Sequence, residues 1–267
     1  MNEDLIPEEA LNYLLGKGIQ PAFDYRDVWR SEHNHMFTVA KMMNEDMLSD
    51  VKIAVEKALA EGMSFKEFKD YLKPYLVKQG WWGQVMMDDP LTQETKQVQL
   101  GSNARLKTIY RTNMKTARAA GQWERIERTK ESHPYLLYEL GPSREHRPDH
   151  VKWNGLMLPA DDSFWHTHYP SNGWGCNCRV RQVSQAQAEK LKQSGISARV
   201  QEVDESTGLA TGRFTSERID VHTTAPQIKT RKMLNKRTGE VESVPEGIDP
   251  GWNYNPGINR TPFKQNN

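Results

Sequence analysis

The sequence predicts an α+β protein: a helical N-terminal lobe, a small mixed α+β lobe with a His/Cys-rich loop, and an extended C-terminal tail. Three observations support this. Apolar residues repeat at helical spacing through the first 130 residues, strand-like segments appear after residue 134, and prolines interrupt the chain after residue 204. We place the domain limits at 1–130, 131–203 and 204–267.

Composition excludes several classes of protein as first interpretations. The 267 residues include 36 basic and 35 acidic side chains, and the mean hydropathy is −0.81. No apolar run approaches the ~18 residues of a membrane helix, and the acidic start of the chain lacks the features of a signal peptide. Two cysteines are too few for a disulfide scaffold. We therefore expect neither a membrane protein nor a secreted one.

Two helices are expected before residue 62. Pro7 suits the first turn of a short helix that Gly16 ends. Ser31 is expected to cap a long second helix that Gly62 ends, because apolar residues there recur every three or four positions. These positions are Met36, Ala40, Met43, Met47, Val51, Ala54 and Ala58.

A third helix and a connection complete the first part of the lobe. Ser64 and Glu67 have the spacing of a capping box, which predicts a helix that Pro74 and Gly80 limit. Residues 80–100 then read as a connection punctuated by Gly80, Gly83 and Pro90. Its paired tryptophans, Trp81 and Trp82, are expected to fill a core position between two lobes rather than to anchor a partner.

Residues 103–130 predict a strongly basic helix. Residues 101–130 hold eight basic and two acidic side chains, and five of the basic ones fall on one helical face: Lys107, Arg111, Lys115, Arg118 and Arg125. Such a face binds nucleic-acid phosphates or an acidic protein surface, or is simply solvated. Residues 229–237 hold five more basic side chains, a second candidate for such contacts.

The second lobe is expected to mix strands and one capped helix. Strand-like segments cover 135–140, 178–183 and 196–203. Between the last two, Ser184 and Gln187 form a capping box that starts a helix, and Gly195 ends it. Trp153, Trp165 and Trp174 are expected to form a small aromatic core for the aliphatic-poor segment between the strands.

Polar chemistry is concentrated between residues 146 and 178. Cys176 and Cys178 are two residues apart, so on a strand their side chains point to the same face. With His150 and His168 they predict a tetrahedral structural zinc site, in which His166 is a substitute ligand. The alternative is a pair of partly buried thiols beside hydrogen-bonded imidazoles.

We expect no catalytic activity, because the sequence lacks the motifs that define the common active sites. It contains no HExxH, no GxxxxGK[ST] and no GxSxG. The zinc-deaminase signature is also absent. The competing hypothesis is a metal-dependent nuclease or transferase that uses the His/Cys cluster, with Asp149, Asp161 or Asp162 as a carboxylate base.

Residues 147–181 resemble the phage Mu F-like minor head protein family. The resemblance rests on RPDH, on GLMLPADDSFWHTHYPSNGWG and on the CNCRVR that follows it. Further pieces similar to the family lie in order along the chain. They are WRSEHNHMFTVAK from Trp29, WWG from Trp81, IYRTN from Ile109 and GIDPGW from Gly247.

The resemblance implies a bacteriophage or prophage protein that acts in head morphogenesis and in DNA packaging or delivery. The implied partners are the portal protein, the major capsid or scaffold protein, and phage DNA bound without sequence preference. The implied location is the host cytoplasm during assembly and then the interior or portal region of the head. Two positions depart from the family pattern: Pro142 stands near the place of a usual aspartate, and His166 replaces an acidic residue.

Overall fold

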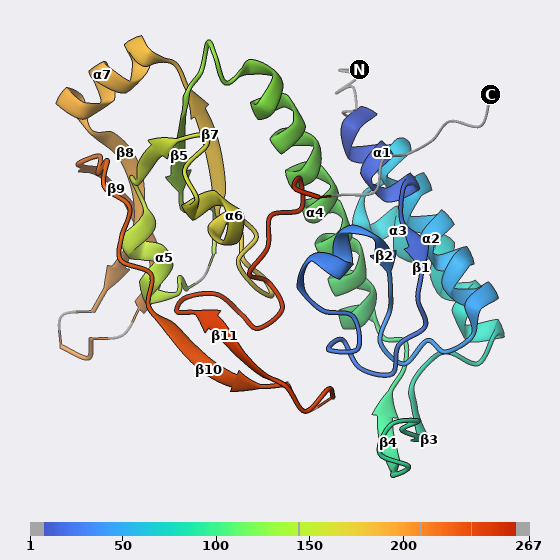
Figure 1. Cartoon of the computed structure of the whole chain (residues 1–267). Helices are drawn as coiled ribbons and strands as arrows, with labels where there is room; N and C mark the ends of the chain where they lie inside the picture. The colour runs from blue at the N-terminus through green and yellow to red at the C-terminus, as the bar shows by residue number, and fades with distance from the viewer. Residues whose placement is uncertain (1–7, 144, 205, 209, 236, 260–267) are drawn as a thin grey trace. The chain divides into compact units, whose positions relative to one another are not determined.

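A computed structural model describes residues 8–143, 145–204, 206–208, 210–235 and 237–259 (Figure 1). The chain divides into two compact units that are interleaved in sequence. The first unit comprises residues 1–123, 234–241 and 256–267, and the second comprises 124–233 and 242–255. Helices and strands both occur, which confirms the predicted α+β class. Among the described helices, none has the length and apolar character needed to cross a membrane.

Helices build the apolar core of the first unit. They are α1 (Glu8–Leu15), α2 (Glu45–Ala60), α3 (Phe65–Lys78) and the first part of α4 (Asn103–Thr129). Their apolar stripes meet in one cluster that includes Tyr13, Leu48, Val55, Phe68, Leu76 and Leu106. The predicted capping box of α3 is confirmed, because Glu67 N–H donates to Ser64 Oγ at 3.3 Å and Ser64 N–H donates to the Glu67 carboxylate at 2.7 Å.

The predicted start of the second helix at Ser31 is wrong. Arg30–Asn34 form a short 3-10 helix, η1, and β2 (Met36–Phe37) pairs in parallel with β1 (Gly18–Ile19). Lys41 has a φ of +66°, which no right-handed helix accommodates. The cap of α2 is Asn44, whose side chain accepts a hydrogen bond from Met47 N–H at 2.7 Å. The helical spacing of apolar residues therefore continues through residues 36–43, although the backbone of this segment does not form an α-helix.

Residues 80–100 contain a hairpin that the sequence did not predict. β3 (Gln84–Asp88) pairs antiparallel with β4 (Thr95–Gln99). Side chains on β4 are almost all exposed, so the alternation that identifies a half-buried strand is missing. Trp81 is buried in the core of the first unit, where its indole N–H donates to the Lys41 carbonyl at 2.9 Å. The core role expected for Trp81 is therefore confirmed within this unit.

A three-stranded antiparallel sheet organises the second unit. Its strand order is β6 (Met157–Pro159), β5 (Tyr135–Glu139), β7 (Arg179–Val183). Short helices α5 (Pro148–Trp153) and α6 (Phe164–His168) lie in the segments between these strands, and α7 (Gln185–Ser194) follows β7. β8 (Ile196–Val203) then pairs with β9 (Ala210–Ile219). The strands predicted near 135, 178 and 196, and the helix capped by Ser184, are confirmed.

The extended character predicted for the tail is confirmed. β10 (Thr230–Leu234) and β11 (Val241–Pro245) form a hairpin, drawn in red-orange in Figure 1. The tail also contributes more than exposed arms, because Val244, Ile248 and Trp252 are buried. Residues of this tail belong to both compact units.

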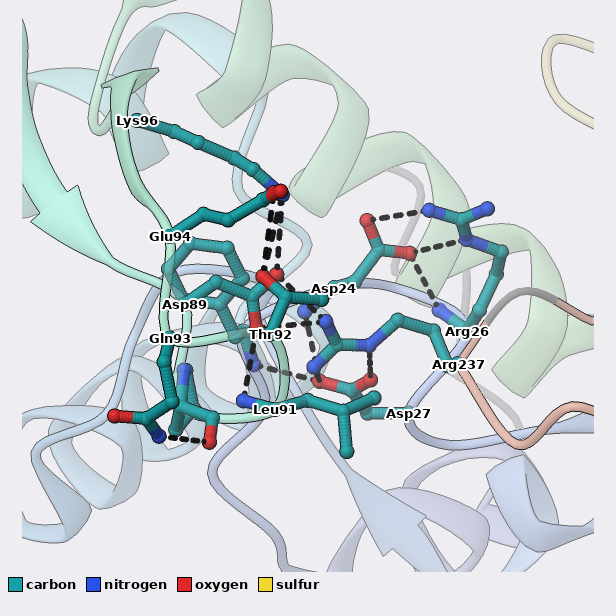
Figure 2. Close-up of polar contacts among 12 residues, drawn as sticks. Asp24, Arg26, Asp27, Asp89, Leu91, Thr92, Gln93, Glu94, Lys96 and Arg237 are labelled. Carbon is teal, nitrogen blue, oxygen red and sulfur yellow. Dashed lines mark hydrogen bonds and ion pairs between the residues drawn. The ribbon is translucent and has the colours of Figure 1, made fainter.

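Arg237, at the tip of this hairpin, is bound inside the first unit (Figure 2). Its Nη1 donates to both carboxylate oxygens of Asp89 at 2.7 Å, and the same guanidinium pairs with Asp27. These bonds from Arg237 hold the pKa of Asp89 well below its usual value. Arg237 is only 8% exposed, so it is not available for the phosphate contact considered for residues 229–237. Lys236 of that run lies outside the described residues.

Candidate functional site

Three of the four predicted metal ligands come together in the second unit. His150 lies on α5, which begins with Pro148 at its first turn. Cys176 and Cys178 lie in the loop that leads into β7. The ligand atoms of these three residues all lie within 4.8 Å of one another. We call this group the histidine–dicysteine cluster.

Both sulfur atoms of the cluster face the same imidazole nitrogen. His150 Nδ1 lies 3.4 Å from Cys178 Sγ and 3.8 Å from Cys176 Sγ. The other ring nitrogen of His150, Nε2, lies 2.8 Å from the carbonyl oxygen of Gly247. Because a carbonyl accepts hydrogen bonds and never donates, Nε2 carries the proton and Nδ1 has a free lone pair when the ring is neutral.

The two thiols of the cluster have unequal acidity. The pKa of Cys176 is lowered chiefly by the hydrogen bond that the Cys178 thiol donates to its sulfur, with His150 adding to the effect. The same bond and burial raise the pKa of Cys178. Tyr138 lies beside the cluster, and burial raises the pKa of its phenol well above the ordinary value. The hydrogen bond between the two sulfurs thus makes Cys176 the more acidic thiol of the pair.

The fourth predicted ligand, His168, lies outside this three-donor group. It is buried on α6, stacked on Phe164 at a ring distance of 4.3 Å and edge-on to Trp153 at 5.0 Å. Its Nδ1 lies 2.8 Å from Thr167 Oγ1. Burial lowers the pKa of His168 to about 4, so the ring is neutral at physiological pH. The substitute ligand, His166, is exposed on the same helix.

Two of the three carboxylates considered as a catalytic base are engaged in local contacts. Asp149 forms an ion pair with Lys152 at 2.8 Å. Asp162 accepts a hydrogen bond from the backbone N–H of Phe164 at 2.8 Å. Asp161 is exposed. None of the three belongs to the cluster of donor atoms that the described residues form.

Sequence reasoning assigned no role to the segment 247–252, which supports the cluster. Besides the bond from His150 to Gly247, the N–H of Asp249 donates to the Asn172 carbonyl at 3.0 Å. The Asp249 carboxylate accepts from Trp174 N–H at 2.8 Å and pairs with Arg147 at 2.7 Å. The GIDPGW motif of the resemblance was the available signal. Because it lies far from the cysteines in sequence, its support of the cluster could not be predicted.

Gly247 has a conformation and a neighbourhood that require glycine. Its φ is +80°, in the region that side chains disfavour. A Cβ at this position would lie 2.7 Å from Asp149 Cβ and 2.7 Å from the Trp153 ring. The close approach is what brings the Gly247 carbonyl to His150.

The predicted basic face lies on α4 as expected, but its five members are not equivalent. Lys107, Arg111 and Arg118 are exposed, and none forms an ion pair within the part of the chain that the structure describes. Lys115 and Arg125 are half-buried and interact with other groups of the protein. The positions facing inward, including Leu106, Ala117 and Ala120, are buried as the helical period predicts.

Comparison with known proteins identifies relatives of this chain. Residues 49–181 match the family described as phage Mu protein F like protein. A protein of Escherichia phage Mu, provisionally named capsid assembly protein F, is 35% identical over 263 residues, which are 95% of this chain and 54% of that protein. The Mu-like prophage FluMu F protein of Haemophilus influenzae is 34% identical over 229 residues, which are 85% of this chain and 50% of that protein.

The chain thus spans about half the length of the curated relatives that it matches. No solved structure matches it. The family match includes the histidine–dicysteine cluster and the whole of the basic helix, and it confirms the resemblance drawn from the motifs.

Proposed function

We propose that this chain, which matches the phage Mu protein F like family over residues 49–181, is a structural component of phage head assembly. The observation that carries the proposal is the similarity to the phage Mu protein named for capsid assembly, which extends over 95% of the chain. Such a role requires stable surfaces rather than a catalytic centre, and the carboxylates near the cluster are held in structural contacts.

The proposed partners are other proteins of the phage head. We expect the chain to contact the portal protein and the major capsid or scaffold protein, in the host cytoplasm during assembly and then inside the head or at its portal. It acts there in the packaging or delivery of DNA. These assignments rest on the similarity to the family.

Quantitative mass spectrometry of purified proheads and virions tests this proposal. If the chain is a head component, it will appear at a low and fixed ratio to the major capsid protein. A deletion of its gene will then reduce the yield of DNA-filled heads. Expression of the protein in the host without its appearance in any particle would contradict the proposal.

Contact with DNA is proposed for the exposed basic residues of α4. At 100° per residue, Lys107, Arg111 and Arg118 lie within about 40° of one another around the helix. They are exposed cations without an ion pair to any described residue, and hence are free to neutralise phosphates. Neutralising phosphates releases counterions, so the affinity of such a face for DNA falls steeply as salt rises.

The matched experiment reverses three charges on α4 and three elsewhere. The variant K107E/R111E/R118E is expected to bind duplex DNA more weakly and to flatten the slope of log affinity against log salt by up to about 3. The control K66E/K78E/K190E has the same net charge and changes three exposed lysines outside both basic segments. If both variants lose equal affinity, the α4 face has no special role.

The second candidate function is a metal-dependent nuclease or transferase. The observation favouring it is that the described cluster supplies three donors, and a catalytic metal keeps one position open. Incubation of the pure protein with supercoiled plasmid and zinc, magnesium or manganese distinguishes the two. Intact plasmid is expected, and cleavage that disappears in His150→Ala would establish the enzyme instead.

A further inference from the structure

The geometry of the histidine–dicysteine cluster suits more than hydrogen bonding between its members. A neutral imidazole has one lone pair on Nδ1, and it accepts a hydrogen bond from only one thiol at a time. Here two sulfurs lie 3.4 and 3.8 Å from that atom, in a pocket where His150 is 2% exposed and Cys176 is 5% exposed. Three such donor atoms close together in a buried pocket form the arrangement in which proteins bind a metal ion.

The separations between these donors fit one zinc ion. With Zn–S near 2.3 Å and Zn–N near 2.05 Å, tetrahedral geometry places a nitrogen and a sulfur ligand about 3.6 Å apart. The two observed nitrogen–sulfur distances lie on either side of that value. A cation placed among the three atoms therefore needs little movement of the protein.

The surroundings of the cluster are those of metal ligands. Metal-bound histidines usually donate their second ring N–H to a carbonyl or carboxylate, as His150 Nε2 does to Gly247. Trp153 stacks on the His150 ring at 5.0 Å and fixes its orientation.

We propose that His150 Nδ1, Cys176 Sγ and Cys178 Sγ bind one zinc ion, which fastens α5 to the loop before β7. Binding displaces the two thiol protons to solvent, and the sulfurs bind as thiolates. The described residues bring no fourth His, Cys, Asp or Glu to the group, so a water molecule completes the tetrahedron. This proposal is independent of the proposed role in head assembly, because it concerns how the second unit is stabilised.

The first test needs no variant, because the chain has only two cysteines and a thiol reagent therefore reads this site alone. The purified, reduced full chain is expected to contain one zinc per molecule. Both thiols should resist the reagent until a chelator removes the metal. Cobalt in place of zinc should give the thiolate charge-transfer absorption and the intense visible bands of four-coordinate cobalt. Reactive thiols and no bound metal, before and after addition of zinc, would overturn the proposal.

Variants then assign the ligands. His150→Ala is expected to lose zinc, and Cys176→Ser and Cys178→Ser to weaken binding at least 10-fold and alter the cobalt absorption. His166→Ala is the matched control, because it removes an exposed imidazole from the same segment. His168→Ala tests the fourth position, and zinc should be retained. Loss of zinc in His168→Ala together with unchanged binding in His150→Ala would refute the assignment.

Discussion

The helical core of the first unit and the His/Cys segment of the second are stabilised by different contacts. In the first unit, Leu48, Val55, Phe68 and other apolar side chains from successive helices are fully buried together. In the second, the buried set around the cluster mixes aromatic rings with polar side chains. The polar members include His150, Asn154, His168 and Asn172.

The two regions also differ in how they depend on contacts that are distant along the chain. In the first unit, the helical period places the apolar side chains of each helix, and Arg237 adds pairs with Asp27 and Asp89 across 210 and 148 positions. Around the cluster, His150 bonds to Gly247 across 97 positions and Arg147 pairs with Asp249 across 102. A region whose folding depends on such distant partners is sensitive to single backbone or ligand changes, whereas the helical core is sensitive to lost volume.

The largest expected effect is a cavity in the helical core. Phe68 is fully buried and lies 5.3 Å from the ring of Tyr110. Phe68→Ala should destabilise the first unit by about 3–5 kcal/mol, because it removes buried area and leaves a void. Urea unfolding followed by circular dichroism measures the loss. Tyr71→Ala on the same helix is the control, because Tyr71 is 52% exposed, and equal losses would contradict a core role for Phe68.

The next largest loss of stability is expected in the second unit, at Gly247. Gly247→Ala should cost about 1 kcal/mol for its positive φ and about 1–3 kcal/mol more for the clash with Asp149 and Trp153. Gly239→Ala is the matched control, because Gly239 has a φ of +77° but no atom within 4 Å of a Cβ. Thermal unfolding of both variants separates strain from crowding, and equal shifts would show that crowding is absent.

Helix caps are expected to contribute equally to stability in the two units, because each cap is formed by residues a few positions apart. Ser64 caps α3 and Ser184 caps α7 with the same reciprocal pair of hydrogen bonds. Ser64→Ala and Ser184→Ala should each cost about 1 kcal/mol of unfolding free energy. Chemical denaturation of the two single variants checks this. A much larger loss at either position would mean that the serine does more than cap its helix.

The smallest effect concerns pH. Arg237 lowers the pKa of Asp89 in the folded chain, so the carboxylate contributes stability at pH values above its ordinary pKa near 4. That contribution should be lost progressively as the pH falls below about 4. Asp89→Asn removes the titrating group and should be less stable at neutral pH, with a weaker acid dependence. Acid titrations of the same slope in both proteins would contradict this role.

Elements that depend on local signals could be predicted from the sequence. The capped starts of α3 and α7, the strands β5, β7 and β8, and the basic helix α4 all follow from residues within a few positions of each other. The proximity of Cys176 and Cys178 was also predicted, although the two residues lie in the loop before β7 and not on a strand. The spacing of apolar residues alone predicted too early a start for α2, because it does not reveal that β1 pairs with β2.

The residues that complete each site became apparent from the tertiary structure alone. It brought His150 to the sulfurs, kept His168 against Phe164, and supplied Gly247 and Asp249 from a distant segment. Likewise it turned Arg237 inward to Asp89. The physical reason is that burial and hydrogen bonding are satisfied by whichever groups the chain brings together in space, and spacing along the sequence does not constrain partners about a hundred residues apart.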